Sequence, residues 1–490
     1  MHPFMSATAA VFHLGIFALV MWLITQRFRK NLGTGSISGF LVADRNVSWL
    51  FGGFSIAASW TWALALMVSV QMAYEQGFSG IFWFTLPNIL AVVMYSKLGR
   101  IIRRDAHQLR DGYSLPEWMF FKYPNRGVAY IYLFVFLQYQ LMAATVQIYA
   151  GAHLLSAATG ISTLYLMPTV LGVTLIYSIV SGMVASIATD FIQMASMLLF
   201  GGIIVIAALF EAGPHLMLSG VGNGGSVNPF DPKILLTLGF INSVALFSAG
   251  INDQQLWQRC FAIKESDLGR SFVLGGLTFG AIPIMLSILG FLAADPSVGL
   301  VVSPGFDHAL IGFAVVTQIL GAAWAILFIY ALMAGFCSTL DSAILAISSL
   351  WALVRARPWV REHPTSQYSV RTGRMIMLIA GMAALLLSYA VELLPGFGLK
   401  YLFWFYNGIC AATLVPTFLA LLWKKLTIRG ILIGSGASLA IGFPLLFYGS
   451  MTQNDKLIAC TYLGIVIFSS SVCYITRSRE GSQIETAISD

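Results

Sequence analysis

Residues 318–350 read QILGAAWAILFIYALMAGFCSTLDSAILAISSL, and Asp341 is the single charged residue among them. A helix that crosses a bilayer needs about 20 mostly apolar residues, so this stretch is long enough to span a membrane. The whole chain of 490 residues has the same character, with 58% hydrophobic and 10% charged residues. A soluble protein has about 25% charged residues. This composition excludes a soluble enzyme and predicts an all-α polytopic membrane protein.

The sequence predicts one membrane domain over residues 1–490 with thirteen spanning helices. They lie at about 6–25, 47–75, 80–99, 127–158, 163–182, 186–210, 233–250, 270–293, 318–350, 374–395, 401–423, 429–448 and 456–476. The runs at 47–75 and 318–350 are long for single spans, which indicates a tilt or a break.

The basic residues are distributed unequally between alternate loops. One set of loops holds 24 of the 27 Lys and Arg residues, Arg104 and Arg259 among them, and the other set holds only Lys233, Lys400 and Lys456. Cytoplasmic loops are enriched in Lys and Arg. We therefore predict a multi-pass protein of the plasma (inner) membrane, with the N-terminus outside and the C-terminus in the cytoplasm. Because the charges follow the loops, we expect no nucleic-acid partner despite the net charge of +7.

Two carboxylates, Asp190 and Asp341, lie inside apolar stretches. A carboxylate at the bilayer centre costs about 2.5–3.5 kcal/mol on insertion scales, so such residues normally face the bundle interior or a water-filled path. The structural alternative is that Asp190 caps a helix and that Asp341 bonds neighbouring hydroxyls.

A polar stripe accompanies Asp341. Gly335, Ser338, Thr339 and Ser342 recur at helical spacing, which places one small residue and three hydroxyls on one helix face. Hydroxyl oxygens suit a hard cation such as sodium. The alternative is a packing seam of small residues between helices.

Two predicted spans are interrupted by Gly and polar residues. Residues 54–63 read FSIAASWTWA, and residues 239–259 carry a similar break. Each interrupted helix opens a group of five spans, at 47–210 and 233–423. Because five is an odd number, the second group starts on the opposite side of the membrane from the first. Paired interruptions in inverted repeats point to a binding site at the midplane.

Three motifs resemble signatures of the sodium–solute symporter family. Residues 181–193 (SGMVASIATDFIQ) resemble its G-G-x-x-A-x-x-x-T-D-x-x-Q signature, and residues 338–342 (STLDS) its S-[ST]-x-x-S stretch. Residues 40–45 (FLVADR) resemble F-x-x-A-G-R, with Asp44 in place of Gly. The resemblance covers nearly the whole chain. It implies a LeuT-like 5+5 inverted repeat with an extra N-terminal helix (6–25) and two C-terminal helices (429–476).

The resemblance also implies ion ligands. The sodium site would use the carbonyls of Ala58, Thr61 and Gly335 with the hydroxyls of Ser338 and Thr339. A second ion site would use Asp190, Ser338 and Ser342, with Asp341 as an acidic departure from the hydroxyl often found there.

The function that follows is sodium-coupled import of a small polar solute by alternating access, with Na⁺ as coupling ion and no enzymatic activity. The runs SWTWA at 59–63 and DQ at 253–254, followed by WQ at 257–258, look like the urea-transporting branch. Candidate solute contacts are Trp60, Trp62, Gln138, Gln140, Asn242, Phe247, Trp404 and Asn407. The same side chains also suit packing and satisfied amides.

Other functions stay open at this point. A proton-coupled symporter of the same fold would use the same core, and a channel would need no ion gradient. A solute sensor would need an output domain, which we do not expect. An intramembrane aspartyl protease would need Asp190 and Asp341 about 3 Å apart, sharing a proton. The oligomeric state is left open.

The charge asymmetry makes a topological prediction. A cysteine at Ser482 should be shielded from an impermeant thiol reagent in intact cells, and a cysteine at Gly222 should be labelled. The unmodified chain is the control, because it carries five cysteines of its own. The opposite labelling pattern would overturn the orientation.

Overall fold

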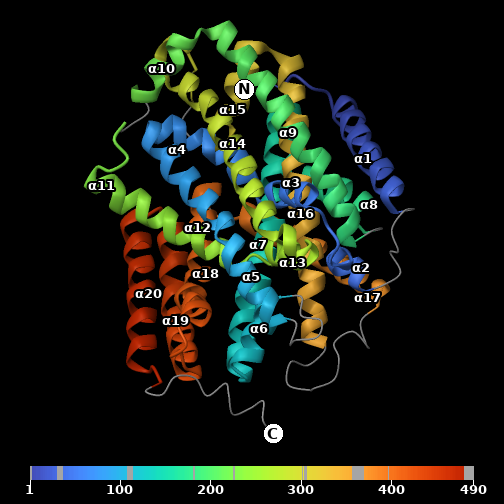
Figure 1. The fold of residues 1–490 in the computed structure, drawn as a ribbon. Helices are drawn as coiled ribbons and strands as arrows, with labels where there is room; N and C mark the ends of the chain where they lie inside the picture. The colour runs from blue at the N-terminus through green and yellow to red at the C-terminus, as the bar shows by residue number, and fades with distance from the viewer. Residues whose placement is uncertain are drawn as a thin grey trace.

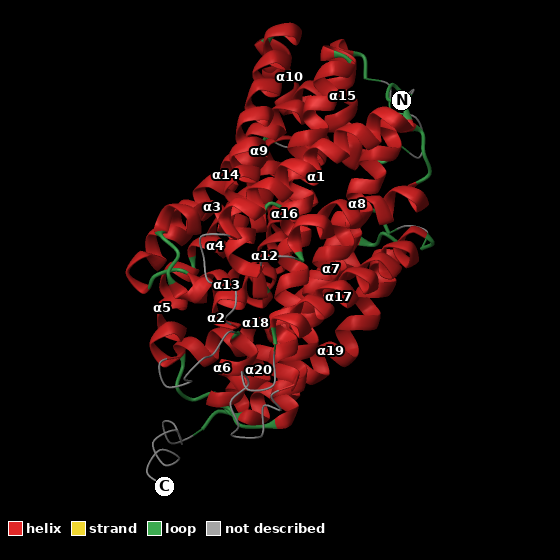
Figure 2. Ribbon diagram, turned by 90° about the vertical axis from the view of Figure 1, so that its right-hand side faces the viewer, coloured by secondary structure: helices red, strands yellow, loops and turns green. Residues whose placement is uncertain are grey.

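The computed structural model describes residues 3–29, 37–106, 114–179, 182–223, 227–300, 302, 306–355, 369–394 and 397–478; Ser181 and Ser482 lie outside these ranges. Within these ranges the chain folds into helices and forms no β-strand (Figures 1 and 2). The α-helices are α1 Ala7–Arg29, α2 Ile37–Val42, α3 Trp49–Trp60, α4 Ser69–Val93, α5 Tyr95–Ala106, α6 Leu115–Lys122, α7 Arg126–Thr159, α8 Thr163–Ser178, α9 Gly182–Ala212, α10 Pro214–Asn223, α11 Pro232–Ile234, α12 Phe240–Asn252, α13 Gln254–Ala262, α14 Leu268–Ala294, α15 Ile311–Leu320, α16 Ala322–Arg355, α17 Val370–Glu392, α18 Leu399–Leu422, α19 Ile428–Met451 and α20 Asp455–Ile475. Short 3₁₀ or π segments are η1 Ala43–Arg45, η2 Leu64–Val68, η3 Leu235–Gly239, η4 Glu265–Asp267, η5 Pro296–Val298 and η6 His308–Leu310.

The all-α polytopic fold is confirmed. In the described part of the chain, eleven helices are long and apolar enough to cross a membrane, and two shorter apolar helices lie at Thr163–Ser178 and His308–Leu320. The thirteen expected spans agree roughly with this set. One boundary was wrong: the run at 318–350 is divided at Gly321, whose φ of 85° ends α15 and lets α16 begin.

The two predicted spans at 47–75 and 80–99 are separated inside α4. Gly77 has φ 58° and ψ −147°, a conformation that is almost restricted to glycine. The chain therefore turns sharply at Gly77. This turn gives the first two core spans the boundary that the sequence predicts.

Both interruptions predicted from the sequence are present. Helix α3 ends at Trp60, and Thr61 leaves the helical region with ψ 75° before η2 resumes the span. Helix α12 ends at Asn252, and Asp253 with ψ 106° separates it from α13. The broken helices lie among α14, α16 and α18 in the interior of the bundle (Figure 1).

The helices outside the predicted core lie on its flanks. Helix α1 packs against α8 and α9, and α19 pairs with α20 on the other side of the bundle (Figure 1). Large apolar side chains such as Phe210, Leu386 and Ile441 are exposed on outer helices. A continuous apolar exterior is what a protein surrounded by lipid presents.

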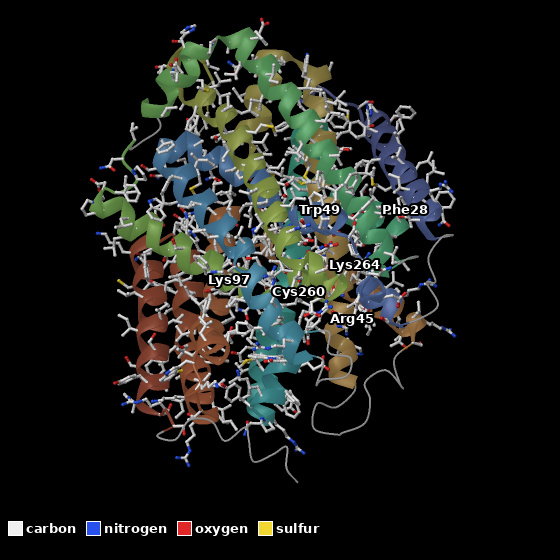
Figure 3. All side chains as sticks on the ribbon, in the orientation of Figure 1. Phe28, Arg45, Trp49, Lys97, Cys260 and Lys264 are labelled. Carbon is white, nitrogen blue, oxygen red and sulfur yellow. The ribbon has the colours of Figure 1, made fainter. Side chains whose placement is uncertain are left out.

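Basic side chains gather around the C-terminal end of α13. Arg45 lies over the Phe261 ring at 5.7 Å, and Arg103 donates to the Cys260 carbonyl at 2.8 Å; Figure 3 labels Arg45 and Cys260. Arg259, however, was wrongly placed with the loop cations, because its side chain is 1% exposed inside the protein.

Candidate functional site

The break in α3 releases backbone oxygens inside the bundle. Unpaired backbone at membrane depth is tolerated only where protein or a water-filled cavity surrounds it. The Thr339 hydroxyl of α16 approaches two of these oxygens, the Thr61 carbonyl at 3.3 Å and the Ser59 carbonyl at 3.4 Å. Three oxygen atoms from two helices therefore meet at one point.

Gly335 makes this meeting of α3 and α16 possible. A Cβ atom at Gly335 would lie 3.3 Å from the Thr61 carbonyl oxygen and 2.4 Å from the Leu66 Cδ1 atom. The lack of a side chain at Gly335 thus allows α16 to approach the broken segment closely. Of the expected sodium ligands, the structure brings Thr61, Gly335 and Thr339 together.

The other two expected sodium ligands, Ala58 and Ser338, lie within one helical turn of Thr61 and Thr339. Ala58 lies one turn before the break, and its carbonyl accepts the Thr61 N–H at 3.2 Å. Ser338 donates its hydroxyl hydrogen to Asp190 Oδ1 at 2.6 Å. The lone pairs of Ser338 Oγ remain available, because the hydroxyl acts as a donor in this bond.

The residues expected to form a second ion site meet around a different cation. Asp190 Oδ2 accepts from Arg259 Nη2 at 2.7 Å and from the Ser55 hydroxyl at 2.6 Å. Arg259 Nη2 also donates to Ser342 Oγ at 2.7 Å. The Arg259 and Asp190 side chains are 1% and 0% exposed, so the structure forms a buried ion pair where the resemblance implies a ligand of a second ion.

Asp341 lies on the neighbouring face of α16. Its carboxylate is next to the hydroxyls of Ser178 and Ser186, and its side chain is buried. Among the described residues, no cationic group lies within 4.0 Å of it. The two carboxylates are held by different partners.

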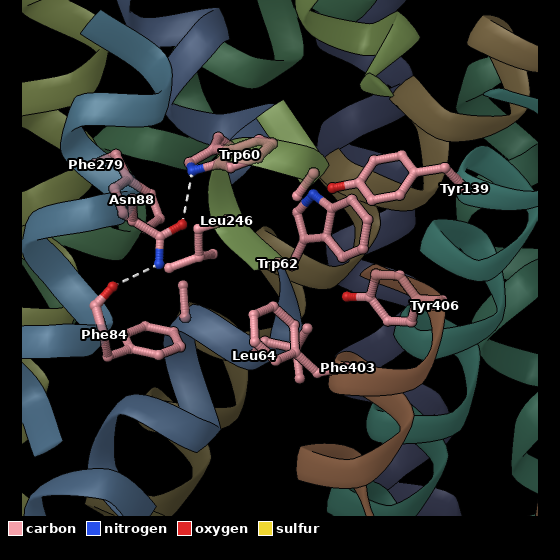
Figure 4. Close-up of a pocket in the computed structure, with 12 residues that line it drawn as sticks. Trp60, Trp62, Leu64, Phe84, Asn88, Tyr139, Leu246, Phe279, Phe403 and Tyr406 are labelled. Carbon is pink, nitrogen blue, oxygen red and sulfur yellow. Dashed lines mark hydrogen bonds between the residues drawn. The ribbon is translucent and has the colours of Figure 1, made fainter. Parts of the chain in front are cut away.

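A small cavity lies beside the break (Figure 4). Trp60 and Trp62 line it from the broken helix, and the Trp62 ring packs against the Tyr139 and Tyr406 rings at 5.1 and 5.8 Å between centroids. Trp60 Nε1 donates to Asn88 Oδ1 at 3.0 Å, as Figure 4 shows. The other lining residues are Leu64, Ala65, Phe84, Leu246, Ala249, Phe279 and Phe403.

One polar atom at this cavity lacks a partner. Trp62 Nε1 is buried and makes no hydrogen bond within the described part of the protein. A buried donor of this kind is normally paired. The volume of the cavity, taken as the space open to the centre of a water molecule, is about 20 Å³. About 10–15 Å³ on this measure holds one water, so the cavity suits a group of very few atoms.

The other six expected solute contacts are not among the lining residues. Gln138 donates to the Tyr406 carbonyl at 3.4 Å, and Trp404 Nε1 donates to Asn242 Oδ1 at 3.1 Å. Gln140 donates to Asp253 Oδ1 at 3.0 Å. The remaining two are Phe247, which is half-buried, and Asn407, which is buried.

The sequence reasoning missed Asn88, Tyr139 and Tyr406. Tyr139 lies between the expected contacts Gln138 and Gln140 on α7. Asn88 carries a usable signal, because it is an amide inside an apolar span next to Pro87. Tyr406 adjoins the expected contact Asn407.

Comparison with known proteins shows the family to which the chain belongs. A family model described as the sodium:solute symporter family matches residues 40–437. The urea-proton symporter DUR3 of Oryza sativa subsp. japonica is 23% identical, over 90% of this chain and 65% of the rice protein. The urea active transporter of Saccharomyces cerevisiae is 21% identical, over 88% of this chain and 62% of the yeast protein. The chain thus spans about two thirds of the length of these urea transporters.

Sodium-coupled proteins are also similar. The sodium/pantothenate symporter of Haemophilus influenzae is 25% identical, over 88% of this chain and 86% of that protein. A solved structure of a Na⁺-coupled sialic acid symporter, in its substrate-bound outward-open state, has a TM-score of 0.75. It covers 96% of this chain and 98% of its own at 17% identity, which shows that the two share a fold.

The close approach at Gly335 gives a prediction. Gly335→Ala should push α16 away from Thr61 or displace Leu66, at a cost of about 1–3 kcal/mol for overpacking. Its unfolding temperature in detergent should therefore fall below that of the unmodified protein. Gly434→Ala is the control, because the nearest atom to its Cβ would be 3.6 Å away. Equal unfolding temperatures for Gly335→Ala and Gly434→Ala would contradict the close approach.

Proposed function

Because this chain belongs to the sodium:solute symporter family, we propose that it is a sodium-coupled symporter that imports a small polar solute. The proposed location is the plasma membrane, with the N-terminus outside, as the distribution of Lys and Arg between the loops favours. We take the two halves, 47–210 and 233–423, as inverted repeats that move against each other in alternating access. The proposed activity is transport, without catalysis.

The observation that carries the sodium coupling is the meeting of Thr339 with the Thr61 and Ser59 carbonyls. Carbonyl and hydroxyl oxygens are ligands that hard cations prefer. A sodium ion among them would join the broken helix α3 to α16. Binding would thus favour the conformation in which α3 and α16 are close, and a ligand shifts a conformational equilibrium only through such a preference.

We propose urea as the solute, on three grounds. The cavity of about 20 Å³ suits a molecule of very few heavy atoms better than a sugar. The free Trp62 N–H would meet the carbonyl oxygen of urea. The relatives from rice and yeast are named as urea transporters.

A proton-coupled symporter is the second candidate. The rice relative is named a urea-proton symporter. Asp341 is a buried carboxylate that has hydroxyl neighbours and no cation within 4.0 Å among the described residues. In that case uptake would follow a proton gradient in the absence of sodium.

The sodium site is tested by exchanging only the hydroxyl of Thr339. Thr339→Val keeps the shape of the side chain but removes the oxygen, and Thr339→Ser keeps the oxygen. Losing one contact to a charged group costs roughly 1.5–3 kcal/mol, which is roughly a 10- to 150-fold loss of sodium affinity. Thr339→Val should therefore shift the sodium activation curve of uptake to higher concentration by that factor.

The Ser variant serves as the control and should keep a curve close to that of the unmodified protein. Because coupling between two ligands is reciprocal, the solute affinity of Thr339→Val should fall at fixed sodium and recover at high sodium. Unchanged sodium activation in Thr339→Val would contradict the proposed site.

The solute site is tested at Trp62. Trp62→Phe keeps a ring in the cavity but removes the free N–H. A neutral hydrogen bond is worth about 0.5–1.5 kcal/mol, so the KM for labelled urea should rise roughly 2- to 10-fold while sodium activation is unchanged. Trp83→Phe is the matched control, since the Trp83 N–H bonds the Pro229 carbonyl outside the cavity. An equal KM in Trp62→Phe and the unmodified protein would refute this contact.

A further inference from the structure

The Arg259 guanidinium reaches three helices from the second broken segment. It extends from α13 and donates through Nε to Ser55 Oγ of α3 at 2.8 Å. Through Nη2 it donates to Asp190 Oδ2 of α9 and to Ser342 Oγ of α16, each at 2.7 Å. It also donates through Nη1 to the Gln255 carbonyl at 3.1 Å, within its own helix. All five of these residues are buried.

These contacts use the oxygens that a second ion would need. Asp190 Oδ2 and Ser342 Oγ accept from the guanidinium, and Asp190 Oδ1 accepts from Ser338. The expected second site therefore does not fit a free metal ion in this arrangement. A sodium ion there would also meet the positive charge of Arg259 across a few ångströms of low-dielectric interior, where repulsion is strong.

The pair is also difficult to separate. Breaking a buried ion pair is strongly unfavourable, because it leaves an uncompensated charge in the interior. A free cation would have to displace a tethered one that makes five donor contacts, the four above and a further one from Nε to the Ser55 carbonyl at 3.2 Å.

We propose that Arg259 is a built-in cation that permanently occupies the Asp190 site, so that this transporter binds a single sodium ion per cycle. This inference rests on the proposed sodium coupling and specifies its stoichiometry. Asp190 then acts as a positioning residue for the remaining sodium site. It accepts the Ser338 hydrogen, which leaves the lone pairs of Ser338 Oγ free for the ion bound beside Thr339.

The arrangement also links the two broken helices. Arg259 belongs to α13, the segment that follows the break at Asp253, and Ser55 belongs to α3, the segment before the break at Thr61. The tethered guanidinium holds α13 against α3 throughout. A sodium ion at the same place would have to bind and leave in every cycle. Sodium binding at Thr339 therefore acts on a preformed junction.

The test counts sodium ions directly. Equilibrium binding of labelled sodium to the purified full-length protein should saturate at one ion per chain, with a Hill slope of one. Two ions per chain would overturn the built-in cation while leaving sodium coupling intact. No sodium binding would overturn both this inference and the proposed function.

Variants of Arg259 and Asp190 test the number of bound sodium ions further. Arg259→Gln removes the tethered charge and leaves Asp190 open, so binding should rise to two ions per chain with a slope above one. Arg259→Lys keeps a cation and should stay at one ion. The double variant Asp190→Asn with Arg259→Gln removes both charges and should also stay at one.

A folded Arg259→Gln protein that still binds one sodium ion would contradict the proposal. If Arg259→Gln does not fold, the double variant and the unmodified protein still decide, because two ions in either would contradict it. A merely structural role of Arg259 would change stability without changing the number of ions bound.

Discussion

A helix that stops inside a membrane must satisfy its free carbonyl groups within the protein. Thr61 breaks α3 in this way, and much of the site follows from that break. The free carbonyls of Ser59 and Thr61 face the Thr339 hydroxyl, and Gly335 allows α16 to lie close enough for the contact. The same break turns Trp60 and Trp62 toward one cavity. Ion site and solute cavity are thus two consequences of a single interruption.

The second interruption, at Asp253, supplies the fixed charge. Helix α13 carries Arg259 into the interior, where its contacts with Asp190, Ser55 and Ser342 join four helices. Buried ion pairs contribute little net stability compared with apolar packing, but they impose a specific arrangement. Here the pair and the Ser338 hydrogen bond orient the polar face of α16 toward the break. The geometry therefore relates the two halves of the bundle through charge as well as through packing.

Much of this arrangement is predictable from the sequence, because membrane helices obey strict rules. Apolar runs predict the spans, and the helical spacing of Gly335, Ser338 and Thr339 places them on one face. Hydrogen-bond partners are less predictable. Arg259 follows the polar residues 252–255 and comes five positions before Lys264, so its charge resembles a loop signal. Only the structure of α13, which begins after the break at Asp253, reveals that the Arg259 side chain is buried.

The side chains that line the cavity are hard to predict for a related reason. The sequence analysis names the amides Gln138 and Gln140 as candidate contacts, whereas Tyr139 between them lines the cavity. These residues belong to α7, and a helix can present any of its faces to the site. The rotation of α7 about its axis depends on its packing against α16 and α18. Trp62 was predictable because it adjoins the break itself.

The most direct test of sodium-coupled symport is uptake of labelled urea into proteoliposomes that contain the purified protein. An inward sodium gradient, an equal potassium gradient and an inward proton gradient without sodium would be compared. We expect urea to accumulate above its external concentration with the sodium gradient alone. Equal accumulation with the proton gradient, or mere equilibration under all three conditions, would contradict it.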